Sequence, residues 1–432
     1  MVLIYTHTTS PRLQYTCNFI FKELLNVDHA ITIDSEMFKE HEGVCINYSD
    51  LSIKEGEFRI NPVSLLFEEH IRLQATSCFD YKGHKAFFKT SNTDIPFDIF
   101  AASFFLLSRY EEYLPHTLDM YGRFAHENSL AFKEGFLHLP LVNIWVQDLV
   151  LEIKKKYSIF NVQYSMFNFV PSYDIDIAYS YKHKGLVRNL GGFMRSPSIE
   201  RMKVLLGLQK DPFDSYSWLN NLHEQNNITQ AVYFFLVAEK NGRYDKNILP
   251  HKDIMWKLVK QHAKKYTVGI HPSWQSSDDL SLLKKEKDFL SAMAEKNITV
   301  SRQHYIRFDL PRGSFQQLMD TGITDEYSMG YGSINGFRAS VASSFYWYDI
   351  KNETQTELRI HPFCFMDANS FYEQHFSAEQ AYKELMQYYT ICKQVNGTLI
   401  TIWHNNFLGT DKMFEGWKEI WERFVETVRR ES

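Results

Sequence analysis

The chain has 432 residues, which is enough for two or three domains with substantial cores. With 23% charged and 44% hydrophobic residues, its composition is that of an ordinary soluble protein. A net charge of -5 provides no basic footprint for nucleic acid, and no run approaches the ~20 apolar residues that span a bilayer. We therefore expect no nucleic-acid partner and no membrane span.

The cysteines are five, scattered, and without a CxxC pair. This pattern argues against a disulfide framework and against a thiolate zinc site. Residues 1–7 lack the positive charge and the long apolar run of a signal peptide, so we expect a cytoplasmic protein.

The first part of the chain predicts a small α/β domain. Residues 2–6 have the pattern of a strand, residues 11–25 that of a helix with one apolar side, and residues 30–33 that of a second strand. Residues 96–113 predict an aromatic helix that is apolar nearly all round, as in a helix enclosed by other elements. The helix predicted at residues 141–157 ends in three lysines, which suit the negative end of its dipole.

A change of pattern near residue 165 predicts a domain boundary. Residues 1–165 would form an accessory α/β domain of unknown role, and residues 166–432 a second domain in which strands and helices alternate. A loop with Gly185, Gly191 and Gly192 lacks the GxGxxG spacing of a phosphate site. The predicted strands are residues 169–173, 231–236, 266–271, 298–301 and 398–403, and the main helices lie near residues 218–222, 254–259, 279–296, 377–392 and 414–428.

Repeated βα units imply parallel strands with right-handed crossovers. Over about 265 residues, such units suit a barrel, whole or incomplete, better than an open sheet. We predict an α/β fold in which an incomplete or distorted (β/α) TIM-like barrel follows the smaller domain.

Four predicted strands end in reactive side chains. Singly, the acids suit turns or helix caps and the histidines suit ordinary polar positions. Because the carboxyl ends of parallel strands meet on one face, we expect these side chains to converge. Carboxylate and imidazole together are ligands for zinc or a similar ion, and a further acid and histidine would supply a base and an acid for hydrolysis. The residues are Asp174, Asp176, His271, Arg302, His304 and His404.

Five segments resemble, in order, the motifs of the polysaccharide deacetylase family, the carbohydrate esterases of nodulation-type deacetylase homology. They are residues 173–176 (YDID), 232–235 (VYFF), 269–273 (GIHPS), 302–305 (RQHY) and 402–404 (IWH). The resemblance covers about residues 166 to 410. Members of this family are metal-dependent enzymes that remove N- or O-acetyl groups from glycans, so a carbohydrate substrate is implied.

The first domain carries a weaker resemblance. Residues 97–103 (FDIFAAS) and 108–113 (SRYEEY) are similar to an uncharacterised domain attached to deacetylase-like modules in Bacteroides-type bacteria. The resemblance implies a two-domain protein of that kind.

The family resemblance implies a role for each strand-end residue. Asp174 would be the general base that activates a metal-bound water, and Asp176 and His271 would be ligands of a divalent metal, zinc before cobalt or nickel. Arg302 would orient Asp174, and His404 would protonate the leaving group. The oxyanion would lie between the metal and a backbone N–H, with that of the residue after His304 as the candidate.

Two positions depart from the family pattern. Its two acids are adjacent, whereas Ile175 separates them here, so base and ligand could exchange roles. Its metal-histidine motif has a second histidine four residues on, where this chain has Gln275. We predict that His304 is the third ligand instead. The further histidines considered for that place are His183, His251 and His361.

Four residues are predicted to bind substrate. Tyr305 directly follows His304. Trp274 and Trp403 adjoin the expected site and could stack on a sugar ring, with buried packing as the alternative for both. Arg338 could bind a carboxylate or phosphate from the cleft, or pair with an acid. Asp367 is a further strand-end acid, with helix capping as its other interpretation.

Three functions compete at this point. The first is a metal-dependent hydrolase that removes acetyl groups from a carbohydrate. The second is an inactive, deacetylase-like carbohydrate-binding protein, which Gln275 would favour. The third is glycoside hydrolysis by Asp174 and Asp367, which would survive chelation.

Overall fold

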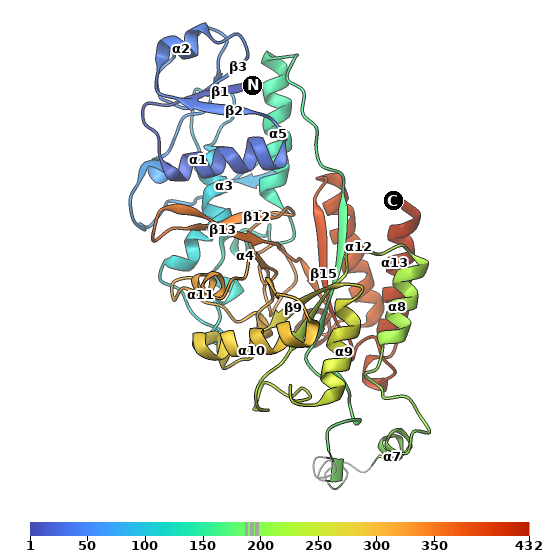
Figure 1. Ribbon diagram of the computed structural model, residues 1–432. Coiled ribbons are helices and arrows are strands. Elements are labelled where there is room, and N and C mark those ends of the chain that lie inside the picture. Colours follow the sequence, from blue (N-terminus) through green and yellow to red (C-terminus); the bar gives the residue numbers. More distant parts are fainter. Residues whose placement is uncertain (186–188, 191–193, 195–197, 432) are drawn as a thin grey trace.

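The computed structural model describes residues 1–185, 189–190, 194 and 198–431. Gly191 and Gly192 of the predicted loop lie outside the described residues. Figure 1 shows the N-terminal region beside a larger α/β body, with helix α5 running down to their junction.

The N-terminal region contains a four-stranded parallel sheet of order β2-β1-β3-β4. Helix α1 begins after Ser10, whose side chain accepts the Leu13 N–H, and has Pro11 in its first turn, where a missing N–H costs nothing. Helix α3 is buried along its whole length, as its apolar sequence predicts. The elements are β1 (Val2–Tyr5), α1 (Pro11–Cys17), π-helix η1 (Asn18–Leu24), β2 (His29–Thr32), α2 (Ser35–Glu40), β3 (Val44–Asn47), β4 (Phe58–Arg59), β5 (Phe79–Tyr81), β6 (His84–Ala86), α3 (Ile99–Leu107), α4 (Leu130–Lys133) and α5 (Leu141–Lys156).

The rest of the chain builds a nine-stranded sheet of order β12-β13-β11-β10-β9-β8-β7-β15-β14. Every recorded pairing in it is parallel except that of the hairpin β12–β13. The strands are β7 (Asn168–Ile175), β8 (Val232–Leu236), β9 (Thr267–His271), β10 (Val300–Ser301), β11 (Asp325–Glu326), β12 (Phe345–Asp349), β13 (Thr354–Ile360), β14 (Phe365–Met366) and β15 (Thr398–His404).

The predicted α/β class with a large, mainly parallel sheet is confirmed. Within the residues that the structure describes, no pairing joins the edge strands β12 and β14, so no closed barrel is present there. The hairpin β12–β13 was not predicted. It extends beneath α1 (Figure 1). Tyr15 of α1 donates a hydrogen bond to the Tyr346 carbonyl at 2.8 Å, and Phe19 of η1 packs on Phe345.

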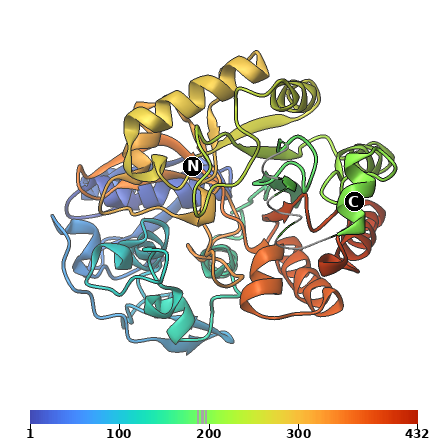
Figure 2. The same cartoon turned by 90° about the horizontal axis from the view of Figure 1, so that it is seen from below.

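Helices surround this sheet on its outer side (Figure 2). In α13, Trp421 packs on Phe169 and Tyr173 of β7, so the last helix covers the central strands. A capping box of Ser377 and Gln380 begins α12, the helix predicted near residues 377–392. In the described part of the chain, every helix is too short or too polar to cross a bilayer. The helices are α7 (Ile199–Leu205), α8 (Tyr216–Gln225), α9 (Asp253–Ala263), α10 (Leu280–Ala294), α11 (Ser314–Asp320), α12 (Ala378–Gln394) and α13 (Trp417–Glu431).

Candidate active site

A cavity of about 470 Å³ lies at the carboxyl ends of the central strands, where ligand sites of α/β folds form. Its volume is within the range of small-molecule sites. Side chains that follow five different strands line it, including Asp176 after β7, His271 at the end of β9, His304 after β10, Ala368 after β14 and Asn406 after β15.

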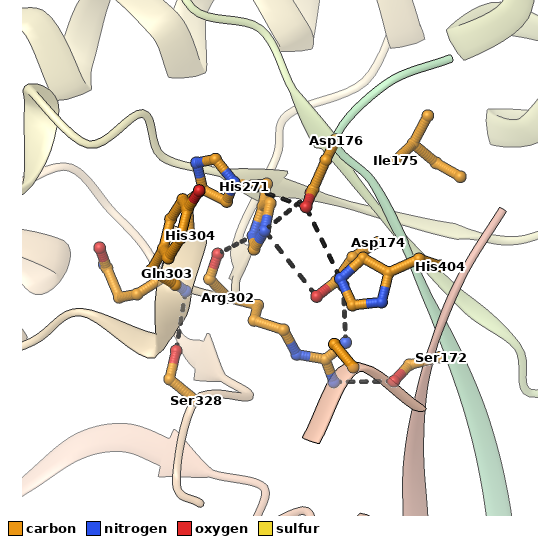
Figure 3. A network of polar contacts seen from close by, with 12 residues as sticks. Ser172, Asp174, Ile175, Asp176, His271, Arg302, Gln303, His304, Ser328 and His404 are labelled. Atoms are coloured by element: carbon orange, nitrogen blue, oxygen red, sulfur yellow. Dashed lines mark hydrogen bonds and ion pairs between the residues drawn. The ribbon is translucent and has the colours of Figure 1, made fainter. Parts of the chain in front are cut away.

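Asp174 near the end of β7 and Asp176 directly after the strand point to the same side, because side chains alternate along an extended chain. Ser172 and Asp174 both contact Arg302, whose Nη2 donates to Ser172 Oγ at 2.7 Å and whose Nη1 donates to Asp174 Oδ1 at 2.8 Å. Asp176, two residues on, faces the same site, and Ile175 points away from it (Figure 3). The intervening Ile175 therefore leaves both carboxylates in the site.

Three histidines direct their Nε2 atoms at the Asp176 carboxylate (Figure 3). The distances are 3.3 Å from His271, 3.4 Å from His304 and 3.6 Å from His404. His271 Nε2 also lies 3.8 Å from Asp174 Oδ2. Ligand atoms of Asp176, His271 and His304 all lie within 4.8 Å of one another, so one ion could contact all three.

The other ring nitrogen of each histidine has its own acceptor. Nδ1 lies 2.5 Å from the Arg302 carbonyl in His271, 3.0 Å from Asp245 Oδ1 in His304 and 2.6 Å from Asp367 Oδ1 in His404. An acceptor at Nδ1 fixes the proton on that nitrogen. In His271 and His304 this leaves the Nε2 lone pair free to bind a metal.

Charge accumulates strongly in this small volume. Burial would raise the pKa of Asp176, but His304 and His271 hold it well below its ordinary value. Burial would lower the pKa of His304, but Asp176 and Asp245 raise it to about 9. The buried Oδ1 of Asp176 lies 3.3 Å from His271 Nε2 but accepts no hydrogen bond of regular geometry, and a buried carboxylate oxygen needs a partner. A divalent ion would supply that partner and displace protons from the imidazoles.

His404 is the most strongly perturbed of the site histidines. Burial lowers its pKa, but the carboxylates of Asp367, Asp176 and Asp174 outweigh burial and raise it to about 10. Asp367 is buried and also accepts the backbone N–H of His404 at 2.7 Å, so it fixes both the ring and its backbone.

The structure brings all six predicted strand-end residues together. Gln275, which stands where the family has its second histidine, is exposed, and His304 is the third member of the candidate ligand group. Of the alternative histidines, His183 and His251 are exposed, and His361 is bound to Asp325 at 2.8 Å outside the cavity.

Two predicted substrate contacts are wrong. Trp403 is fully buried and packs on Trp421, because its side chain leaves β15 on the helix side. Arg338 is buried and does not line the cavity. Its Nε and Nη2 donate to Glu112 at 2.8 and 2.7 Å, and its Nη1 donates to the Gly330 carbonyl at 3.1 Å. Buried packing and pairing with an acid, the alternatives for these residues, are what the structure shows.

Of the two aromatic residues predicted beside the histidines, the structure places one in the cavity. Tyr305 lines the cavity, whereas Trp274 does not and instead packs behind it, with ring centroids 5.5 Å apart. Trp274 also stacks on Tyr244 at 4.0 Å.

Four residues of the site had no predicted role there or only an incomplete one. Asp367 was recognised as a strand-end acid. Its role as the partner of His404 was not predicted, because it depends on pairing between β14 and β15. Asp245 follows no strand end directly, so its contact with His304 left no pattern in the sequence. Tyr121 and Arg123 line the cavity from the N-terminal region, which sequence spacing does not predict.

Comparisons with known proteins find one matching family model, in the N-terminal part of the chain. The model of a family of unknown function, DUF7033, matches residues 2–158. A search of curated protein sequences finds no match to this chain.

Solved structures of polysaccharide deacetylases align with 61% of the chain at low identity. A Mycobacterium smegmatis protein assigned to that class has 10% identity and a TM-score of 0.41 over 84% of its own length. The polysaccharide deacetylase of Bacillus cereus has 9% identity and a TM-score of 0.30 over 88% of its length. A branching enzyme of Thermococcus kodakaraensis has 10% identity and a TM-score of 0.37, with 62% of this chain and 69% of its own length covered. At these scores none of the matches assigns an activity.

Proposed function

We propose that this chain is a metal-dependent hydrolase that removes N- or O-linked acetyl groups from a carbohydrate. The observation that carries the proposal is the cluster of Asp176, His271 and His304 beside the two flanking pairs Asp174–Arg302 and His404–Asp367. Ligands, base and acid for one hydrolytic step thus line a single cavity.

Asp176, His271 and His304 would hold the ion, with zinc before cobalt or nickel. Two imidazoles and a carboxylate are a donor set of hydrolytic zinc sites. Asp176 Oδ1, which is buried and accepts no hydrogen bond of regular geometry, fits the same interpretation. A bound divalent ion would lower the pKa of a water and polarise the acyl carbonyl.

Asp174 is suited to be the general base. Arg302 occupies its Oδ1, while Oδ2 faces His271 and the ligand group and can accept a proton from the attacking water. Arg302 is fully buried over the Phe234 ring and also donates to the Tyr327 carbonyl, so its orientation is fixed from several sides.

His404 is suited to be the general acid. With a pKa raised to about 10, its ring is protonated at neutral pH. Asp367 holds Nδ1, so the proton on Nε2 is the one that the leaving amine or alcohol can receive.

The resemblance of the five motifs supports an acetylated carbohydrate as substrate, and the lining of the cavity suits one. Tyr305, Tyr372 and Phe407 offer aromatic surface beside the polar floor. The strand order also supports an incomplete barrel, because the sheet follows chain order from β7 to β11 and returns with β15 and β14 on the other side of β7. We also propose that the chain has two domains, residues 1–165 and residues 166–432.

Acetate release tests this function. Purified protein loaded with zinc should release acetate from N-acetylated or O-acetylated oligosaccharides, and a chelator should stop the release. Glycan binding without acetate from any acetylated substrate would favour the inactive binding protein. New reducing ends that still form in the presence of chelator would favour glycoside hydrolysis.

A further inference from the structure

A turn of the N-terminal region, residues 119–123, reaches the cavity. Asp119 Oδ1 accepts the backbone N–H groups of Tyr121 at 2.9 Å and Arg123 at 3.0 Å, and Asp119 Oδ2 accepts Arg123 Nε at 2.6 Å. Gly122 has a positive φ of 72°, which glycine adopts without strain. The turn therefore holds the Arg123 guanidinium in one orientation.

The guanidinium of Arg123 binds the backbone next to a candidate ligand. Its Nη1 donates to the Tyr305 carbonyl at 2.6 Å, and the residue is only 4% exposed. A Cβ on Gly332 would lie 2.0 Å from this Nη1 and 2.9 Å from the Tyr305 oxygen. Only glycine at position 332 leaves room for this contact.

The backbone that Arg123 binds is strained. Tyr305 and Ile306 have φ angles of 60° and 54°, and a β-branched residue such as Ile306 rarely adopts a positive φ. Such a conformation persists only where its surroundings hold it. His304 comes directly before this pair, with its Nε2 on Asp176.

The same turn also contributes to the wall of the cavity. The Tyr121 ring lies 5.2 Å from the Tyr305 ring, and both line the cavity. The region matched by the family of unknown function thus contributes a wall residue and a backbone clamp to the site.

We propose that Arg123 is a positioning residue of the active site. Through the Tyr305 carbonyl it fixes the turn that aims His304 at Asp176, so the N-terminal region completes the site. The consequence for metal affinity rests on the proposed function, whereas the hold on the turn does not.

Amide hydrogen exchange tests the hold without any metal. In Arg123→Met, a peptide covering residues 303–308 should exchange about tenfold faster, because the turn opens locally. Arg359→Met is the matched control, since it removes an arginine contact between the two regions, the ion pair with Glu23 at 2.7 Å, away from the cavity. Unchanged exchange in Arg123→Met, or an equal rise in the control, would overturn the proposal.

Cobalt affinity tests the consequence for His304. Followed by the visible absorption of bound Co²⁺, affinity should fall about 10- to 100-fold in Arg123→Met, the range for residues that orient ligands. Gly332→Ala should reproduce the loss by displacing the guanidinium, and Arg359→Met should not. If wild type binds cobalt and both site variants bind it equally well, Arg123 does not position His304. If the wild-type protein binds no cobalt, the proposed function is contradicted. The amide hydrogen exchange result would still decide whether Arg123 holds the turn.

Discussion

Asp174 in β7 and Asp176 directly after it face the same site and differ in what they touch. Asp174 is bound by Arg302, a contact that suits a base, whereas Asp176 faces three imidazoles, as a ligand would. The sequence left these roles exchangeable, and the contacts favour one assignment.

Two asparagine variants test that assignment. Asp174→Asn should lower kcat by about 10²- to 10⁴-fold, the usual contribution of a general base, and retain the metal. Asp176→Asn should lose the metal. Metal content and acetate release are measured on both proteins. Loss of the metal in Asp174→Asn, with the metal retained in Asp176→Asn, would contradict the assignment.

Asp367 is expected to act only through His404. Asp367→Asn should lower kcat about 10- to 100-fold, because the imidazole loses the carboxylate that fixes its ring and raises its pKa. In a His404→Ala background the same substitution should have little further effect, since residues that act as a unit are not additive. The measurement is kcat of the two single variants and of the double variant. If the fold losses in kcat multiply in the double variant, Asp367 acts independently of His404 and the prediction is contradicted.

Much of the site was predictable because its residues stand at strand ends. Asp174, His271 and His404 needed only the apolar strand before them to be recognised. Asp245 and Arg123 were not predictable, because their contacts join segments 59 and 182 residues apart without a pattern in either segment.

At the scale of elements, α9 packs a histidine against β8 where water does not reach. His262 is 4% exposed, donates Nδ1–H to the Leu258 carbonyl at 2.8 Å, and faces the rings of Tyr233 and Phe235. Burial lowers its pKa to about 4. The folded protein therefore holds this imidazole neutral where an unfolded chain would protonate it.

This histidine should make the fold sensitive to acid. Its contribution to stability is complete above pH 6.5 and is lost as the pH falls toward 4, by roughly 3 kcal/mol in total. His262→Gln should flatten the fall in unfolding free energy over this pH range, measured by urea denaturation. Exposed His251→Gln controls for the substitution itself. A slope unchanged by His262→Gln would refute the prediction.

Long apolar elements were the predictable ones. Strands β7, β8, β9 and β15 and helices α5, α12 and α13 coincide closely with their expected positions. The hairpin β12–β13 was missed because its exposed face carries polar residues and its other contacts lie in the distant N-terminal region.

At the scale of the whole molecule, one apolar core runs through both regions of the chain. A buried ion-pair network joins them as well. Glu112 binds Arg109 and Arg338, and Arg109 also reaches the Arg338 carbonyl. We expect the two regions to unfold together.

Removing one charge from this network should be costly. Glu112→Gln should lower the unfolding free energy by about 3–5 kcal/mol, because it removes the carboxylate that pairs with the buried Arg338, whereas Arg109 keeps its ion pair with Glu111. Glu239→Gln, which breaks an exposed pair with Lys285, should cost at most about 1 kcal/mol. Denaturant titration should show a single transition in each case. Equal losses in the two variants, or separate transitions for the two regions, would contradict this account.

Metal binding by the purified protein tests the central claim most directly. The account predicts one zinc ion per chain after equilibration and dialysis, measured by elemental analysis, and its loss in His271→Ala and His304→Ala. Zinc retained by both alanine variants, or no zinc bound by wild type at micromolar concentration, would contradict it.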